Sequence, residues 1–220
     1  MSTPQRFHRL RAVLDRRQPD LTVLLENVLV PRNLAAVVRS LDAVGGLEAH
    51  AVWPEGKLPI SRPASGGNRK WLPVRKHHTL AEALERLKAR GFRILTADPV
   101  ATATDFRRVD YLRPTAFLLG NEDGGVTVEA RSGADELVAI PMAGMGTSLN
   151  VSVAAALLLF EAGRQRAAAG FYDTPRLDPA HHARLLFEWT YPKLAALCRR
   201  REVAYPPLGP DGEILGELPR

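Results

Sequence analysis

Residues 140–154 read IPMAGMGTSLNVSVA, with a glycine-bearing loop followed by an apolar run. A strand-forming run at 136–140 leads into it, and a helical pattern with an apolar face follows at 149–167. A strand, a glycine-rich loop and a helix in this order predict an α/β unit. The free N–H groups and the dipole at the helix start can meet polar ligand atoms there. Ser148 and Asn150 are expected at or near this helix entrance.

The same stretch has two less specific interpretations. Gly144 and Gly146 suggest a dinucleotide-binding loop, but Leu149 stands where the third glycine of GxGxxG is required. Ordinary capping of the helix by Ser148 is the other, and helix-capping preferences by themselves favour it.

Strand and helix patterns alternate along most of the chain. Residues 79–90 predict a helix with Thr79 as its N-cap, Glu82 at the capping-box spacing and Gly91 at its end. The alternation predicts an α/β fold, a parallel sheet with helices on both faces, whose ligands bind beyond the carboxyl ends of the strands. Strands are expected at 21–25, 48–53, 92–97, 115–119 and 136–140, and helices at 34–44, 79–90 and 149–167.

The 220 residues allow one substantial domain with short extensions. We expect a basic helical extension at 1–18, the α/β domain at 19–170, and a C-terminal helical extension and tail at 171–220. Within the last segment, 178–201 predict one or two further helices. These helices lie outside the alternating pattern, and could pack on the sheet, cover a second subunit or hold RNA.

Basic residues exceed acidic ones by six, and the excess is unevenly placed. Residues 57–78 hold six basic and no acidic side chains, and the first 18 residues carry a net charge of +4. Arginine-rich segments suit a polyanion, because a guanidinium can bind two phosphate oxygens at once, although solvated faces are the alternative. The candidate RNA-binding residues are Arg6, Arg9, Arg11, Arg16, Arg17, Arg62, Arg69, Lys70, Arg199, Arg200 and Arg201.

Several other classes of protein are not expected. The one cysteine, Cys198, cannot form an internal disulfide or a thiolate zinc cluster, and the paired histidines at 77–78 and 181–182 are adjacent rather than one helical turn apart, so no metal site is expected. The N-terminus lacks the apolar region of a secretory signal, and the apolar run at 151–160 is about half of what a membrane span of roughly 20 residues requires. A cytoplasmic location is predicted.

Two more polar loops accompany the glycine-rich stretch. GNEDGG at 120–125 follows the strand at 115–119 directly, and PRNLAAVVRS at 31–40 begins a helix that Asn33 can cap. Arg39 comes after five apolar residues at 34–38, so we expect it to be partly buried and to need an acceptor. Glu122 could supply that acceptor.

Together, in this order, Asn33 with Arg39, the loop after 115–119 and residues 140–154 resemble the three motifs of the SPOUT superfamily of RNA methyltransferases, in its SpoU branch. The third motif is highly specific. Residues 16–23, residues 50–54 and the C-terminal helical region are similar to members of that branch that act on guanosine 18 of the tRNA D-loop. The resemblance therefore covers nearly the whole chain.

This resemblance implies methyl transfer from S-adenosylmethionine to the ribose 2'-hydroxyl of that guanosine. It also implies a trefoil knot in the C-terminal half and a homodimer whose two subunits complete the site. The cofactor would be held by backbone groups at Gly120, Ile140, Leu149 and either Thr96 or Ala97.

The resemblance assigns Arg39 the proton-handling role, with Glu122 orienting it. Because a guanidinium is hardly ever deprotonated in a protein, Arg39 acts either as a transient base aided by the substrate phosphate or as a fixed charge that stabilises the alkoxide. Asn33 and Ser148 would position ribose and phosphate, and Asn150 would brace the loop.

Three other functions are alternatives to methylation of guanosine 18. The same chemistry on another tRNA position or on ribosomal RNA shares the three motifs. A non-catalytic tRNA-binding protein would have lost Arg39 or the cofactor loop, and both are intact. A nicotinamide-dependent oxidoreductase would leave the basic surface unexplained.

Overall fold

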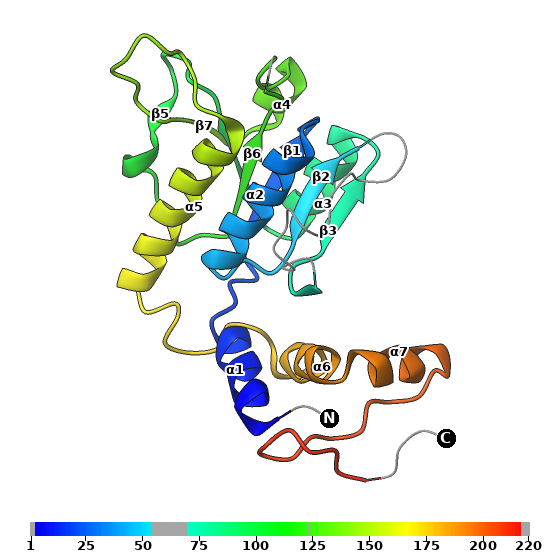
Figure 1. The fold of residues 1–220 in the computed structure, drawn as a ribbon. Coiled ribbons are helices and arrows are strands. Elements are labelled where there is room, and N and C mark those ends of the chain that lie inside the picture. The colour runs from blue at the N-terminus through cyan, green and yellow to red at the C-terminus, as the bar shows by residue number, and fades with distance from the viewer. Residues whose placement is uncertain (1–2, 54–69, 123, 217–220) are drawn as a thin grey trace. The chain divides into compact units, whose positions relative to one another are not determined.

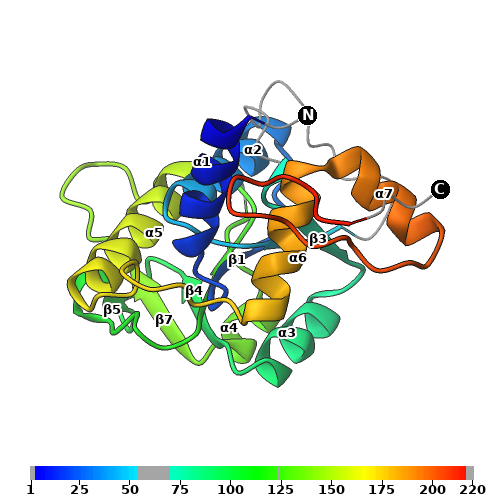
Figure 2. The ribbon, with the colours of Figure 1, turned by 90° about the horizontal axis from the view of Figure 1, so that it is seen from below.

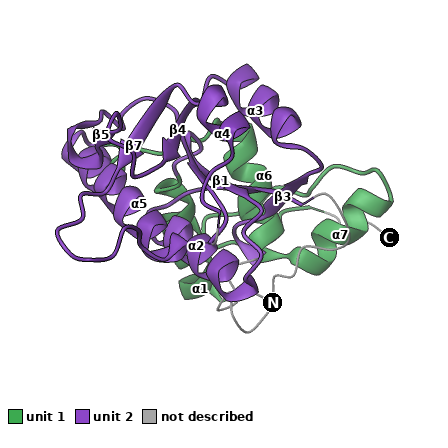
Figure 3. Cartoon of the chain, turned by 90° about the horizontal axis from the view of Figure 1, so that it is seen from above, with its two compact units in different colours: residues 1–17, 171–220 green, residues 18–170 purple. Residues whose placement is uncertain are grey.

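The computed structural model describes residues 3–53, 70–122 and 124–216. The chain divides into two compact units (Figure 3). The larger unit comprises residues 18–170, and the smaller unit joins the two ends of the chain, residues 1–17 and 171–220. Both terminal segments thus belong to one unit.

The larger unit is built on a seven-stranded sheet in the order β3-β2-β1-β6-β4-β7-β5 (Figure 1). All neighbouring strands are parallel, which confirms the predicted sheet. The trefoil knot stays a prediction of the resemblance. The strands are β1 (Leu21–Glu26), β2 (Ala49–Val52), β3 (Val74–His77), β4 (Arg93–Ala97), β5 (Thr104–Asp105), β6 (Thr115–Leu119) and β7 (Glu136–Ala139).

Helices cover both faces of this sheet (Figure 2). On one face lie α2 (Pro31–Ala43) and α5 (Val151–Ala168), which pack on each other. On the other lie α3 (Leu80–Ala89) and α4 (Val128–Gly133), and a 3-10 turn, η2 (Phe106–Arg108), follows β5. Side chains alternate along each strand, so β1 contributes to both cores and is buried throughout.

The start and end of α3 follow the sequence prediction. The Thr79 hydroxyl accepts a hydrogen bond from the Glu82 N–H at 3.1 Å. The Glu82 carboxylate accepts one from the His78 N–H, one residue before the N-cap. Gly91 follows the helix with φ +79°, the left-handed conformation in which glycine lacks the steric cost of a side chain.

Arg166 fixes the C-terminal part of α5 to the segments that precede two strands of the sheet. Its fully buried guanidinium donates to the Asp20 carboxylate at 2.6 Å, to the Gln18 side chain at 3.2 Å and to the Asp20 carbonyl at 3.1 Å. It also donates to the carbonyls of Tyr111 and Arg113 at 3.0 and 3.1 Å. Because these groups precede β1 and β6, the end of α5 is fixed to the amino ends of both strands. The beginning of α5 therefore lies at the carboxyl ends.

Replacing Arg166 by methionine should reduce the free energy of unfolding by about 3–5 kcal/mol, because it leaves the Asp20 carboxylate and several carbonyls without their partner. Arg164→Met is the matched control, since Arg164 is 66% exposed and pairs with Glu161 at the surface. A surface pair contributes about 0–1 kcal/mol. Chemical denaturation measures both, and equal losses for the two variants would contradict the anchoring role.

Two histidines meet inside the larger unit, between β2 and β3. His50 Nδ1 and His77 Nε2 lie 2.9 Å apart, and each side chain is almost fully buried. Glu48 lies 3.6 Å from His50 and Glu82 lies 3.4 Å from His77. Burial and the neighbouring His50 lower the pKa of His77 below its ordinary value of 6.5, against the opposite effect of Glu82. His77 is therefore held in its neutral form.

The lowered pKa of His77 predicts a pH dependence of stability. Below pH 6.5 the unfolded chain binds a proton that folded His77 resists, so the free energy of unfolding should fall as the pH falls from 7.5 to 5.5. His77→Gln should remove part of this loss, and His78→Gln, at the exposed neighbouring position, should not. Urea titrations at both pH values measure the effect. An unchanged loss in His77→Gln would assign it to other groups.

The smaller unit consists of α1 (Pro4–Asp15), α6 (Pro179–Thr190), α7 (Pro192–Arg200) and an irregular tail. All three helices begin at proline, whose missing N–H costs nothing at that position. Helix α1 packs against α6, and the predicted helical segment at 178–201 is two helices. Across the described ranges, the helices are all too short or too polar to cross a membrane.

Candidate active site

The carboxyl ends of β4, β6 and β7 open into a cavity of about 400 Å³ within the larger unit. Its position agrees with the general location of ligand sites in parallel sheets. Three loops form its walls, and Leu119 and Val138 contribute apolar surface from strand ends. The contributions are residue 97 at the end of β4 with residues 98–99 after it, residues 120–122 and 124–126 after β6, and residues 140, 142 and 147–149 after β7.

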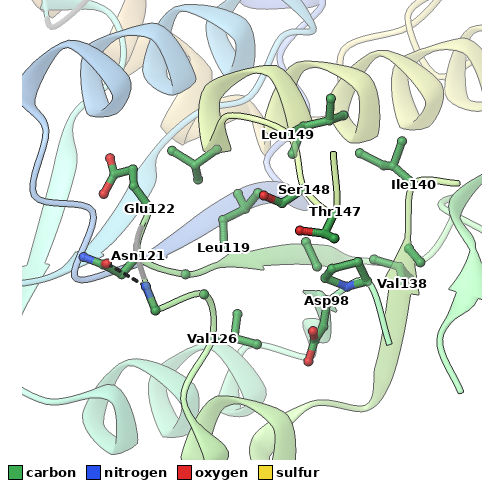
Figure 4. A pocket seen from close by; sticks show the side chains of 18 of the residues that line it. Asp98, Leu119, Asn121, Glu122, Val126, Val138, Ile140, Thr147, Ser148 and Leu149 are labelled. Atoms are coloured by element: carbon green, nitrogen blue, oxygen red, sulfur yellow. Dashed lines mark hydrogen bonds between the residues drawn. The ribbon is translucent and has the colours of Figure 1, made fainter. Parts of the chain in front are cut away.

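Both polar and apolar side chains line this cavity (Figure 4). The hydroxyl groups of Thr147 and Ser148 lie near Leu119, Glu122 lies at one end, and Ile140 lies at the other. Of the predicted cofactor-binding positions, Gly120, Ile140 and Leu149 line the cavity, and of the alternatives Thr96 and Ala97 it is Ala97 that does so. Thr96 is buried within β4 and donates to the Ala130 carbonyl at 3.4 Å.

The loop after β6 is held by its own backbone. Asn121 and Gly125 exchange two backbone hydrogen bonds of 2.9 Å, and the Asn121 side chain donates to the Asn27 carbonyl at 2.8 Å. A Cβ on Gly120 would lie 2.1 Å from the Gly125 carbonyl oxygen, so the backbone can approach this closely because residue 120 is glycine. The loop is thereby fixed against the cavity.

Glu26 fixes the far end of the same loop. Its buried carboxylate accepts hydrogen bonds from the Thr127 hydroxyl at 2.7 Å and from the Thr127 N–H at 3.2 Å. Thr127 in turn caps α4 through the Ala130 N–H. Sequence reasoning missed Glu26, although a carboxylate at the end of the apolar run LTVLLE was a signal that could have found it.

Asp98 is a second missed residue. It lines the cavity directly after β4, is 5% exposed, and forms an ion pair with Arg131 from α4. This pairing raises the pKa of Arg131. The signal in the sequence was an acidic residue at the carboxyl end of a strand, beside Thr96 and Ala97.

Three of the predicted catalytic residues come together: Asn33 from the first turn of α2, Glu122 from the loop after β6 and Asn150 from the N-cap of α5. The Asn33 side-chain amide donates to the Glu122 carboxylate at 2.7 Å, and the Asn150 amide donates to the Asn33 side-chain oxygen at 3.3 Å. Asn150 also caps α5, because its side-chain oxygen accepts from the Ser152 N–H at 2.9 Å. The interpretation of Ser148 as the cap is therefore wrong, and its exposed side chain lines the cavity instead.

Arg39 departs from its prediction. It is exposed rather than partly buried, and forms no hydrogen bond or ion pair with any described residue. Glu122 holds Asn33 instead of Arg39. The physical reason is the helix period, since six residues advance α2 by about 240°, which places Arg39 and Asn33 on different sides of the helix. Arg32, seven residues before Arg39, shares its exposed face.

Among the predicted RNA-binding residues that the structure describes, Arg17 is the one that is buried. It is 1% exposed and its guanidinium lies 5.4 Å from the centre of the Trp189 ring, so it packs inside the smaller unit and cannot be a free phosphate ligand there. Arg62 and Arg69 lie outside the described residues. Exposed or half-buried are Arg6, Arg9, Arg11, Arg16, Lys70, Arg199, Arg200 and Arg201.

Known proteins share this fold and this arrangement of loops. The model of the SpoU rRNA Methylase family matches residues 20–160, and that of the SpoU rRNA methylase C-terminal region matches residues 164–217. The chain therefore belongs to the SpoU rRNA methylase family. In the described segments, no group of three or more His, Cys, Asp or Glu side chains could hold a metal ion.

Three individual proteins that are similar to this chain have more specific names than the family models. The tRNA (guanosine(18)-2'-O)-methyltransferase of Thermus thermophilus is 54% identical over 85% of this chain and 96% of its own length. The TrmH/SpoU tRNA modifying enzyme of Aquifex aeolicus has a TM-score of 0.80 at 40% identity, covering 86% of this chain and 96% of that one. The SpoU methyltransferase AviRb of Streptomyces viridochromogenes, in complex with AdoMet, has a TM-score of 0.62 at 28% identity, covering 70% and 62%.

Gly120→Ala should lower the free energy of unfolding by about 1–3 kcal/mol, because the new methyl group meets the backbone of Gly125 and Val126 rather than a flexible side chain. Gly124→Ala is the control in the same loop, since a Cβ there has no described atom within 4 Å, and its effect should stay within about 0.5 kcal/mol. Chemical denaturation measures both variants. Equal stability of the two proteins would contradict the close approach at Gly120.

Proposed function

We propose that the protein transfers the methyl group of S-adenosylmethionine to the ribose 2'-hydroxyl of guanosine 18 in tRNA. The observation that carries the proposal is the cluster of Asn33, Glu122 and Asn150, joined by hydrogen bonds where the first turn of α2 meets two of the loops that frame the cavity. The name of the Thermus relative, 54% identical over most of both chains, supports the same reaction. A relative that carries AdoMet supports the cofactor.

The residues around the cavity suit this cofactor. Its volume of about 400 Å³ lies within the range of roughly 300–1,000 Å³ typical of small-molecule sites. Leu119, Val138 and Ile140 offer apolar surface for a base, and the Thr147 and Ser148 hydroxyls and the loop backbone offer hydrogen bonds. The bound sulfonium would supply an activated methyl group. The chain's own task is therefore to place the ribose oxygen and manage its proton.

Asn33 is the best-oriented group for placing the ribose. Glu122 accepts from its amide nitrogen, and Asn150 donates to its amide oxygen, so both ends of the side chain are fixed. Ser148 adds a free-standing hydroxyl on the cavity wall. Arg39 acts as a fixed positive charge that stabilises the developing alkoxide, because its guanidinium stays protonated.

We further propose that two copies of the chain complete the site. Arg39 is exposed on α2 and does not line the cavity of its own chain. On the same face of the sheet, α5 exposes Val153, Leu157 and Phe160 by 47%, 40% and 57%. Their spacing places them on one side of the helix, and an exposed apolar stripe of this kind is typical of a protein interface.

The remaining expectations concern RNA and location. We propose that the exposed arginines of α1 and the run at 199–201 bind tRNA phosphates, together with Lys70. Arg62 and Arg69 would join them from the basic segment 57–78. Arg17 is not included, because it is buried. A cytoplasmic location, where unmodified tRNA is available, goes with this function.

The test is methyl transfer from labelled S-adenosylmethionine to an unmodified tRNA transcript, with the modified nucleotide mapped by nuclease digestion and mass spectrometry. The wild-type protein should give 2'-O-methylguanosine at position 18 alone. Arg39→Ala should lower kcat by about 10²-fold or more while cofactor binding persists, because the lost charge acts on the transition state. Arg32→Ala, on the same face of α2, is the control and should retain kcat.

Each alternative outcome is informative. Methylation at another nucleotide, or of ribosomal RNA fragments alone, would keep the family's chemistry and overturn the assignment to guanosine 18. Full activity of Arg39→Ala would remove Arg39 from the mechanism.

A further inference from the structure

The smaller unit contains a cavity of its own. It is open to solvent, has a volume of about 920 Å³ and is lined by residues of α1, α6, α7 and by residues 203–208 of the tail. Much of its surface is apolar, with Leu186, Phe187 and Leu208 among the lining side chains. The reaction proposed above gives this cavity no role.

Three arginines reach the cavity from three different helices: Arg11 from α1, Arg184 from α6 and Arg199 from α7. The lining, as far as the described residues extend, includes no acidic side chain. Glu188 lies close by and accepts hydrogen bonds from Arg184 and Arg199, each at 3.2 Å. The Asp15 carboxylate pairs with the lining His182 at 2.7 Å. The three arginines therefore outnumber the two carboxylates that are bonded to lining residues.

Aromatic rings form part of its wall. Phe187 and Tyr205 stack with their centres 4.6 Å apart and their planes at 15°. The Tyr205 hydroxyl donates to Glu188 at 2.9 Å and accepts from Arg199 at 2.9 Å. The same hydrogen bonds therefore fix a ring of the wall and one of the arginines beside it. A flat ring beside positive charge is the combination that binds unpaired nucleotides.

We propose that this cavity binds one unpaired nucleotide of the tRNA, with its base against the apolar and aromatic wall and its phosphate on Arg11, Arg184 and Arg199. The identity of the occupant rests on the proposed function, which makes tRNA the substrate. Charge favours this occupant, because the cavity adjoins the arginine-rich surfaces of α1 and of residues 199–201 within the same unit. The smaller unit is then a second reader of the tRNA, separate from the methyl-transfer site.

Two substitutions separate the base from the phosphate. Ala183→Trp places a large ring in the cavity without changing charge, since Ala183 is an exposed residue of its lining. Arg184→Gln removes one positive charge from a side chain that is about half exposed. Ala196→Trp on α7 is the control for the added ring, because Ala196 is exposed and outside the lining.

The measurement is the affinity of the full-length protein for unmodified tRNA by filter binding at several salt concentrations. Ala183→Trp should weaken tRNA binding by about tenfold or more with an unchanged salt dependence, because the added ring occupies the place of the base and so prevents its stacking. Arg184→Gln should weaken binding and flatten the slope of log K against log salt by about 0.7–0.9, as expected for one lost phosphate contact. Ala196→Trp should bind like the wild type.

Retained affinity in Ala183→Trp overturns the inference, as does an equal loss in Ala196→Trp. Guanosine 5'-monophosphate serves as a second probe. If it saturates the protein by calorimetry and Ala183→Trp abolishes this while tRNA affinity is unchanged, the cavity belongs to a free nucleotide, and the assignment to tRNA is wrong. The Ala183→Trp variant should bind S-adenosylmethionine and unfold thermally like the wild type. If either property changes, the weaker tRNA binding is explained by misfolding, and the inference is overturned.

The two proposals fail separately. If the wild type binds tRNA through this cavity but methylates another nucleotide, the assignment to guanosine 18 falls and the cavity stands. If the wild type methylates guanosine 18 and Ala183→Trp binds tRNA normally, the function stands and the cavity proposal falls.

Discussion

The buried guanidinium of Arg166 is the contact on which the candidate site depends. It holds the end of α5 to the segments that precede β1 and β6, at the amino ends of the strands, whereas the cavity lies at the carboxyl ends. A helix fixed at that end must begin beyond the carboxyl ends of the strands, where its N-cap, Asn150, meets Asn33. Burying this charge is tolerable because Asp20 neutralises it and further oxygens accept hydrogen bonds from its other N–H groups.

The loops of the site are held mainly by backbone and by buried polar side chains, with little apolar packing of their own. Glu26 and Asn27 hold the loop after β6 at two points, through Thr127 and the Asn121 side chain, and the glycine at position 120 lets its two ends approach. A loop held in this way has little conformational freedom to lose when a ligand binds. Binding energy is then available for orientation instead of for ordering the chain.

Sequence reasoning recovered the elements whose signal is a run of buried residues. Strands β1 and β6 are buried at every position, and the cap of α3 is a local pattern, so both were predictable. Strands β3 and β5 were not predicted, because VRKH and TD are short and polar and become strands only by pairing at the two sheet edges. Pairing with a distant segment leaves no trace in such short stretches.

The same limit explains the errors at the site. Asn33, Glu122 and Asn150 were chosen by resemblance, but their mutual hydrogen bonds depend on helix phase, which also separates Arg39 from Glu122. Arg17 was counted with the basic surface because charge counts carry no information about Trp189, 172 positions later in the chain, against which its guanidinium packs. Asp98 went unnoticed because its partner, Arg131, comes from α4, 33 positions later in the chain.

The division of the chain into units has a consequence for its synthesis. Helix α1 leaves the ribosome first, but Phe7, Leu10 and Leu14 on its buried side belong to a unit whose other helices begin at residue 179. Residues 18–170 form a continuous unit and can fold as soon as they have emerged. The smaller unit therefore closes last, so a chain that stops early in translation lacks its arginine-lined cavity even where its sheet is complete.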